Sequence, residues 1–119
     1  YQSKNEFINA ENEIDEYYSG LCLELPECAK RIYICNRYGY QISSNIEKTG
    51  EIISLFNYKN KNWAWRGYFQ DAMKAICSGQ NSFLTEAYRD ATSKEKIYTY
   101  ITAADENTFI FIDIVRDDI

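Results

Sequence analysis

Apolar residues recur at helical spacing over the first part of the chain, ahead of its single proline. The repeating positions are Phe7, Ile14, Tyr18, Leu21 and Leu25. On a helix they would form one stripe, and the acidic residues between them would cover the other faces. Because Pro26 disfavours helical backbone just before it, we expect a long helix over residues 3–24. The stripe spans fewer than three heptads, which is too short to predict a coiled coil.

After the proline, the pattern changes to short apolar runs separated by polar turns. Residues 31–36 (RIYICN) are apolar at odd and even positions alike, which is typical of a strand buried on both faces. A helix is expected over 68–78, where the apolar residues return to helical spacing and Gly79 supplies a stop. The remaining expected strands are 40–44, 83–90, 97–103 and 109–115. Residues 47–62 fit either a short helix or an extended loop.

This order of elements predicts an α+β fold, with one five-stranded antiparallel sheet, flanking helices and a long N-terminal helix. We expect the strand order 2-1-5-4-3, because the first and last strands are apolar on both faces and belong at the centre. Residues 1–24 would form a connector or dimerisation helix, separate from the domain over residues 25–119.

The composition is that of one packed domain without a surface for nucleic acid. The chain has 119 residues, of which 45% are hydrophobic and 16% aromatic, and this argues against disorder. Its net charge is −5, and residues 1–24 hold six acidic residues against one lysine, whereas the rest is balanced. A phosphate backbone or an anionic membrane surface would find no basic stripe here. No apolar run is long enough to cross a bilayer.

The cysteines favour free thiols over disulfides. Cys22, Cys28, Cys35 and Cys77 are spaced too irregularly for a zinc site, and the chain has no histidine to complete one. Two disulfides are possible, but Cys35 lies in an apolar strand and Cys77 on the apolar face of a helix, where a thiol behaves as a small hydrophobe. Buried free thiols favour a reducing, cytoplasmic compartment. An extracytoplasmic segment of a membrane protein is the alternative.

The residue types give catalysis little support. The absence of histidine removes Ser-His-Asp and Cys-His mechanisms as well as histidine-ligated metals. No phosphate-binding loop or dinucleotide-binding glycine motif occurs. The paired acidic residues at 105–106 and 117–118 fall in a turn and in a tail. We therefore expect no enzyme activity and no cofactor.

Residues 62–69 (NWAWRGYF) are the densest candidate for a binding site. They place Trp63, Trp65, Arg66 and Tyr68 at the start of the expected helix. An arginine fork donates two parallel hydrogen bonds to a carboxylate or phosphate, and aromatic walls exclude competing water. Alternatively, the rings belong to the core and Arg66 is stacked or ion-paired. The residue types favour neither interpretation.

Strand alternation adds three further candidates. Tyr88 and Asp90 share one face of their strand, and Asp113 lies among apolar neighbours in the last strand. A buried carboxylate is costly unless it is paired, so Asp113 needs a ligand amine or a cation of this chain. The arginines considered for this pair are Arg66, Arg89 and Arg116.

Four short motifs, in order along the chain, carry a resemblance to a known family. They are Gly39-x-Gln41-x-Ser43-x-Asn45, Trp63-x-x-Arg66-x-Tyr68-Phe69, Glu86-x-Tyr88-x-Asp90 and Phe111-x-Asp113-Ile114. Over residues 32–115 the chain resembles bacterial PAS-like and Cache sensor domains. It resembles in particular the domain that follows the EAL phosphodiesterase module in some cyclic-di-GMP signalling proteins. The resemblance implies a PAS/Cache-like fold and a regulatory role.

The resemblance also implies where a ligand would bind. Cache domains place an arginine followed by aromatic residues at the ligand carboxylate, which corresponds to Arg66, Tyr68 and Phe69. Their Tyr-x-Asp pair corresponds to Tyr88 and Asp90. The aspartate that meets a ligand amine in amino-acid-binding members corresponds to Asp113. Those members have tryptophan in place of Tyr68 and tyrosine in place of Phe69, so the resemblance does not carry amino-acid specificity.

Together these expectations describe a sensory domain that binds a small anionic or zwitterionic ligand and modulates a linked EAL-type output domain. The expected ligand-binding residues are Trp63, Arg66, Tyr68, Tyr88, Asp90 and Asp113. The other expected partner is a second copy, bound through the N-terminal helix. The alternative is a structural dimerisation module with no ligand, in which Trp63 and Trp65 fill the cavity beside Arg66.

Overall fold

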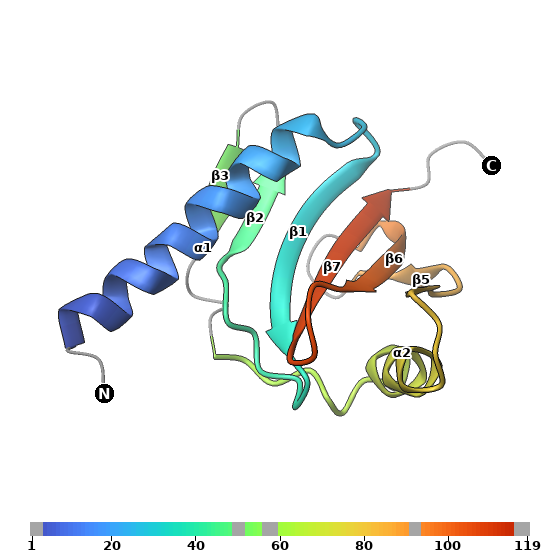
Figure 1. The fold of residues 1–119 in the computed structure, drawn as a ribbon. Helices are drawn as coiled ribbons and strands as arrows, with labels where there is room; N and C mark the ends of the chain where they lie inside the picture. The colour runs from blue at the N-terminus through green and yellow to red at the C-terminus, as the bar shows by residue number, and fades with distance from the viewer. Residues whose placement is uncertain (1–3, 49–51, 56–59, 91–93, 116–119) are drawn as a thin grey trace.

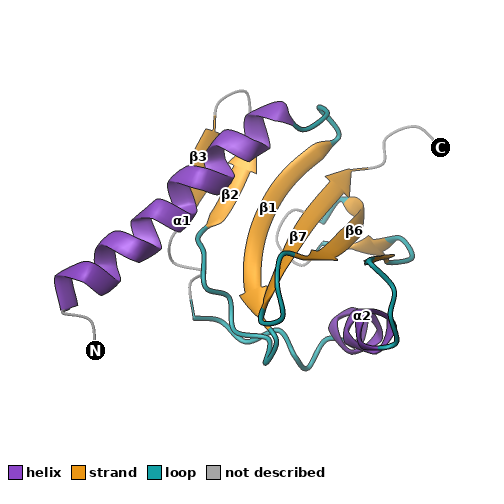
Figure 2. Cartoon of the chain, in the orientation of Figure 1, coloured by secondary structure: helices purple, strands orange, loops and turns teal. Residues whose placement is uncertain are grey.

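The computed structural model describes residues 4–48, 52–55, 60–90 and 94–115. Within these ranges the chain forms two helices and one antiparallel sheet (Figures 1 and 2). The helices are α1 (Lys4–Glu24) and α2 (Gly67–Cys77). The strands are β1 (Ala29–Asn36), β2 (Asn45–Lys48), β3 (Ile52–Leu55), β4 (Ser82–Leu84), β5 (Tyr88–Arg89), β6 (Lys96–Ala103) and β7 (Thr108–Val115). Neither of these helices combines the length and the apolar character needed to cross a membrane.

The sheet has the strand order β3-β2-β1-β7-β6-β4, and β5 also pairs with β6. β1 and β7 lie side by side at its centre, where Ile32 is opposite Ile112 and Ile34 is opposite Ile110. Strands that are apolar on both faces belong where both faces are covered. The predicted central pairing of residues 31–36 with 109–115 is therefore confirmed.

The predicted count of five strands is wrong, since the described residues form a sheet of seven. The expected strand 83–90 is split into β4 and β5. Leu84 pairs with Tyr100 and Tyr88 pairs with Ile97. Between these two pairs, the segment that joins β4 to β5 therefore contains one residue more than the facing part of β6. An extra residue of this kind interrupts the ladder and bends the strand.

Residues 40–48 also depart from the prediction. In place of a strand over 40–44, Tyr40 and Gln41 form isolated bridges, and regular pairing begins only with β2. The Ser43 hydroxyl accepts a hydrogen bond of 2.8 Å from the Ile34 N–H. Polar side chains that bond to backbone groups compete with the strand ladder. The ambiguous segment 47–62 contributes the end of β2 and all of β3.

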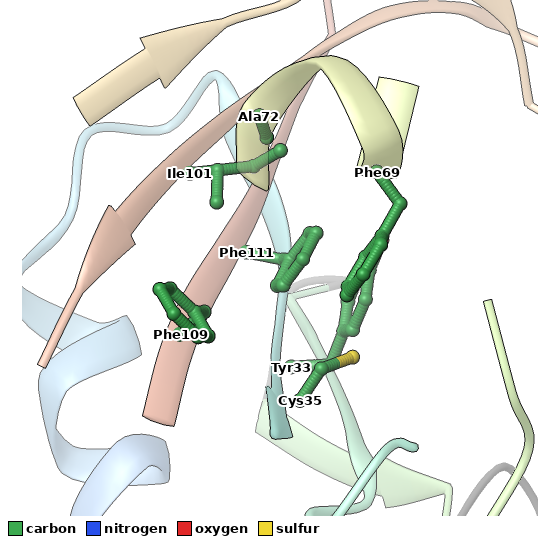
Figure 3. Packing of buried hydrophobic residues seen from close by; sticks show 7 residues of the cluster. All are labelled: Tyr33, Cys35, Phe69, Ala72, Ile101, Phe109 and Phe111. Atoms are coloured by element: carbon green, nitrogen blue, oxygen red, sulfur yellow. The ribbon is translucent and has the colours of Figure 1, made fainter. Parts of the chain in front are cut away.

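The two faces of the sheet bury separate apolar clusters. The cluster under α2 (Figure 3) consists of Tyr33, Cys35, Phe69, Ala72, Ile101, Phe109 and Phe111. On the opposite face α1 packs against β1, β2 and β3, where Cys22, Ile32 and Ile46 are fully buried and Tyr18, Leu21 and Leu25 of the predicted stripe pack around them. Strand alternation explains the division, because odd-numbered residues of β1 face α2 and even-numbered residues face α1.

All four cysteines are free thiols. Cys22 and Cys35 are buried, one in each apolar cluster. Cys77 is exposed, so its expected place on a buried helix face was wrong. The buried residues of α2, Phe69 and Ala72, lie in its first two turns, whereas Cys77 is its last residue.

Candidate functional site

A small cavity lies on the α2 face of the sheet, and we call it the Arg66 cavity. Its volume is about 50 Å³. Its walls include all the residues singled out from the sequence: Trp63, Arg66, Tyr68, Tyr88, Asp90 and Asp113. The other wall residues are Arg31, Tyr33, Gln41 and Asn45. Phe69, which the resemblance placed at the ligand, is instead buried in the core, with its ring stacked on Phe111 at 5.9 Å between centroids.

A glycine turn positions the loop that carries Trp63 and Arg66. Gly39 adopts φ +94°, and a Cβ at this position would lie 2.7 Å from Ala64. The Gly39 carbonyl accepts a hydrogen bond of 2.9 Å from the Trp63 N–H, and the Trp63 carbonyl accepts one of 2.9 Å from the Arg66 N–H. Glycine meets both the backbone requirement and the close approach. Arg66 then takes the N-cap position of α2 with an extended backbone.

Three aromatic rings surround the Arg66 guanidinium. Its Cζ lies 5.2 Å from the ring centroid of Trp65, 5.3 Å from that of Tyr68 and 5.7 Å from that of Tyr88. Ring faces attract a cation at such distances. Within the described residues, Arg66 forms no ion pair and its side chain donates no hydrogen bond. Its fork of donors is therefore available to an anion.

Arg31, in contrast, is paired with three carboxylates. Its Nη1 donates to Asp113 Oδ2 at 2.8 Å and to Asp90 Oδ1 at 3.1 Å. Its Nη2 donates to Asp90 Oδ2 at 3.2 Å, and its Nε donates to Glu47 Oε2 at 2.5 Å. Hydrogen bonds between an arginine fork and carboxylates are among the strongest in proteins. These four residues form a buried ionic cluster on one side of the cavity.

The partner of Asp113 is thus Arg31, and the expected pairing with Arg66 or Arg89 is wrong. Arg89 is exposed and donates to a backbone carbonyl, and Arg116 lies outside the described residues. The sheet explains the pair, because Arg31 lies directly opposite Asp113 in the β1–β7 register, where side chains of opposite charge can meet. The antiparallel pairing of the two central strands could be predicted from the sequence, but the register that places Arg31 opposite Asp113 could not.

A short chain of hydrogen bonds joins Tyr88 to Asp113. The Tyr88 hydroxyl lies 2.5 Å from Thr99 Oγ1, and Thr99 Oγ1 donates to Asp113 Oδ1 at 2.8 Å. Burial raises the pKa of the Asp113 carboxyl to about 6, because its lost hydration outweighs the attraction of Arg31. Burial also raises the pKa of the Tyr88 phenol above its ordinary value, so Tyr88 remains a protonated donor.

Amide side chains complete the cavity, and the sequence analysis did not assign them to the site. Gln41 is fully buried. Its Nε2 donates to Asn45 Oδ1 at 2.7 Å, and its Oε1 accepts from Trp63 Nε1 at 2.9 Å. Both amides belong to the first motif of the resemblance. Their signal in the sequence was a cluster of polar residues within a strand-like segment, since buried amides are retained where every group finds a partner.

The two tryptophans occupy different places, and neither fills the cavity. Trp63 is part of the wall, whereas Trp65 is 67% exposed and covers Arg66 from outside. In the described ranges, no group of three or more His, Cys, Asp or Glu residues could hold a metal ion. Among the described residues the site therefore offers the Arg66 guanidinium and aromatic walls to a small anion, beside an acidic cluster in which Arg31 is paired with three carboxylates.

A model of the EAL-domain associated signalling protein domain matches residues 3–117. The chain is 34% identical, over 101 residues, to the uncharacterized EAL-domain containing protein YkuI of Bacillus subtilis, and the match covers 84% of this chain and 25% of that protein. The crystal structure of Bacillus subtilis YkuI, with an EAL domain, in complex with substrate c-di-GMP and calcium, is similar with a TM-score of 0.76 and 33% identity. This match also covers 84% of the present chain and 25% of the other. The chain thus spans about a quarter of the length of the curated relative that it matches.

Ligand-binding domains of the Campylobacter jejuni chemoreceptor Tlp3 share the fold. The domain in complex with 4-methylisoleucine has a TM-score of 0.56 and 21% identity, over 95% of this chain and 41% of that one. The domain in complex with L-valine has a TM-score of 0.52 and 22% identity, over 95% and 42%. Likeness at this level of identity shows the fold alone, which is Cache-like. The resemblance stated from the sequence motifs is confirmed.

Proposed function

Because the chain belongs to the family of EAL-domain associated signalling domains, we propose that it is a non-catalytic sensory or regulatory domain. In this proposal a small anionic or zwitterionic ligand binds in the Arg66 cavity and modulates a linked EAL-type output domain. The observation that carries the proposal is the Arg66 guanidinium, which three rings surround and which has no anionic partner in the part of the chain that the structure describes.

The surroundings of Arg66 favour an anion in two ways. The rings of Trp65, Tyr68 and Tyr88 pack around the partly buried guanidinium, and partial burial strengthens a charge-assisted hydrogen bond to a ligand. Helix α2 begins directly after Arg66, without a side-chain cap and without an acidic residue in its first turn. The partial positive charge of this helix end therefore adds to the charge of Arg66.

Packing suggests how binding could reach an output domain. Tyr68 contacts Tyr33 of β1 through their hydroxyls, which lie 3.3 Å apart. Tyr33 lies on the cavity face of β1, while its neighbour Ile32 packs in the cluster under α1 on the other face. A ligand that binds one arrangement of β1 more tightly than another would shift α1 with it. We propose residues 1–24 as the connector and residues 25–119 as the sensor.

A second candidate function is a structural dimerisation module that binds no ligand. It is favoured by the size of the Arg66 cavity, about 50 Å³, because ligand pockets usually measure roughly 300–1,000 Å³. In this case the ionic cluster would only stabilise the fold, and α1 would form the interface with a second copy of the chain. The two candidates differ in one observable, which is whether occupation of the cavity changes the stability of the domain.

The free thiols indicate the cellular compartment of the domain under either candidate function. Cys28 and Cys77 are exposed and unpaired with each other, which suits a reducing environment. We therefore propose a cytoplasmic location, on the same side of the membrane as an EAL-type output domain.

Thermal melts with a panel of short carboxylates and amino acids test the proposed function. At least one compound should raise the melting temperature of the wild-type domain. In Arg66→Ala, that shift should fall in proportion to a ten- to hundredfold weaker affinity, because a charge-assisted pair of roughly 1.5–3 kcal/mol is lost. Arg37→Ala is the matched control, since Arg37 is an exposed arginine 5.8 Å from the Tyr38 ring centroid and does not line the cavity. Equal shifts in all three proteins would refute the proposal.

A further inference from the structure

The segment that leads into β2, residues 41–45, buries an unusual number of polar side chains. Gln41, Ser43 and Ser44 are fully buried, and Asn45 is 6% exposed. Burying such groups is costly unless each one finds a hydrogen-bond partner. The partners of this segment lie in two separate places, which are the wall of the Arg66 cavity and helix α1.

On the cavity side, the segment presents two amides, Gln41 and Asn45, which we call the amide wall. Gln41 Oε1 accepts a hydrogen bond of 2.9 Å from Trp63 Nε1. Gln41 Nε2 donates to Asn45 Oδ1 at 2.7 Å and to the Ser43 carbonyl at 3.0 Å. Both amides and Trp63 line the cavity. The placement of the amide wall therefore depends on the backbone of the segment.

On the other side, one carboxylate of α1 holds the same backbone. The Ser44 N–H donates to Asp15 Oδ1 at 2.9 Å, and the Ser44 hydroxyl donates to Asp15 Oδ2 at 2.7 Å. The neighbouring Ser43 hydroxyl donates to the Ser44 carbonyl at 2.8 Å and accepts from the Ile34 N–H at 2.8 Å. Because both oxygens of Asp15 bind one residue, the contact fixes an orientation as well as a distance.

The apolar contacts of α1 do not fix its position in the same way. In the cluster under α1, Tyr18 and Leu21 pack around buried aliphatic side chains of the sheet. Apolar packing of this kind is non-directional, whereas the two hydrogen bonds between Asp15 and Ser44 are satisfied in one placement only. A movement of α1 along the sheet would therefore break these bonds or move the segment that carries the amide wall.

We infer that Asp15 is a positioning residue for the Arg66 cavity, since it holds the amide wall in place through Ser44. The connection does not require a ligand. Its use in regulation rests on the proposed function, because a ligand that moved the amide wall would then act on α1. Such coupling is reciprocal, so the position of α1 would also change the affinity of the cavity.

The indole N–H signals in a proton–nitrogen NMR spectrum of the ligand-free domain test the inference. The chain has two tryptophans. Trp63 reports on the amide wall, whereas Trp65 donates to the Asn62 carbonyl at 3.0 Å and is the internal reference. Trp65→Phe assigns the two signals. Asp15→Asn replaces one acceptor by an NH₂ group, which cannot accept from Ser44, so we expect the Trp63 signal to shift by more than its linewidth.

A second variant and a control complete the experiment. Ser44→Ala removes the hydroxyl donor of the same contact and should also shift the Trp63 signal. Glu16→Gln loses the same charge from the exposed neighbour of Asp15 on α1 and should leave both indole signals in place. A Trp63 signal that stays in place in Asp15→Asn or in Ser44→Ala, or that moves as far in Glu16→Gln, would overturn the inference.

If Asp15→Asn does not fold, Ser44→Ala decides alone. Because no ligand is present, this result is independent of the thermal melts that test the proposed function. Overturning the inference leaves ligand binding by Arg66 intact, and melts without any ligand effect leave the placement of the amide wall by Asp15 intact.

Discussion

Replacing Arg31 by methionine tests the ionic cluster that forms one side of the cavity. Arg31 and its partners Glu47, Asp90 and Asp113 have side chains that are only 5–14% exposed. Methionine keeps much of the length of the side chain but leaves three carboxylates without their cation. Removing one partner of a buried pair costs about 3–5 kcal/mol, and we expect Arg31→Met to lie in that range at pH 8.

The assay is equilibrium unfolding in urea, with the free energy extrapolated to water. Because the orphaned carboxylates can accept protons, the difference between Arg31→Met and wild type should shrink as the pH falls from 8 to 5. Arg37→Met is the control, since Arg37 is exposed and its loss should cost less than about 0.5 kcal/mol. A loss for Arg31→Met no greater than for Arg37→Met would show that the ionic cluster does not depend on Arg31.

Three further predictions concern titration, backbone and the N-terminal helix. The pKa of Asp113 is raised from 3.8 to about 6, so the folded state holds this proton more tightly than the unfolded chain and stability falls as the pH rises from about 4 to 6. In Asp113→Asn that fall should be smaller, as urea midpoints across this range would show; an unchanged slope would contradict it. Gly39→Ala should cost about 1–3 kcal/mol because its Cβ would lie 2.7 Å from Ala64, whereas the control Gly79→Ala, also at positive φ, has no atom within 4 Å and should lose less. Deletion of residues 1–24 uncovers Ile32 and Ile46, so light scattering after gel filtration should show aggregation or a new oligomeric state, and an unchanged, equally stable product would argue against it.

The centre of the fold could be predicted from the sequence because its signals are strong and local. Residues 31–36 and 109–115 are apolar at consecutive positions, and only strands covered on both faces tolerate that pattern. Phe69 and Ala72 similarly identify the buried side of α2 through their helical spacing. Part of the wall of the Arg66 cavity could also be predicted, since Trp63, Arg66 and Tyr68 lie close together in the chain.

The remaining features depend on register, which a single sequence does not display. The pair between Arg31 and Asp113 requires knowing that these residues face each other across β1 and β7. The division of strand 83–90 depends on one extra residue relative to β6, and no glycine or proline marks it. Gln41 and Asn45 bond to each other in a segment whose alternation alone predicted an ordinary strand.

In the proposed function Arg66 binds a ligand carboxylate while Arg31 stays with its acidic partners. Side-chain Nε–Hε signals in a proton–nitrogen NMR spectrum report on each arginine separately, and Arg66→Lys assigns the signal of interest by its disappearance. During a titration with propionate, the Arg66 signal should shift with saturation and the Arg31 signal should stay in place. An Arg66 signal that does not move at saturating propionate, or an Arg31 signal that moves in its stead, would contradict ligand binding by Arg66.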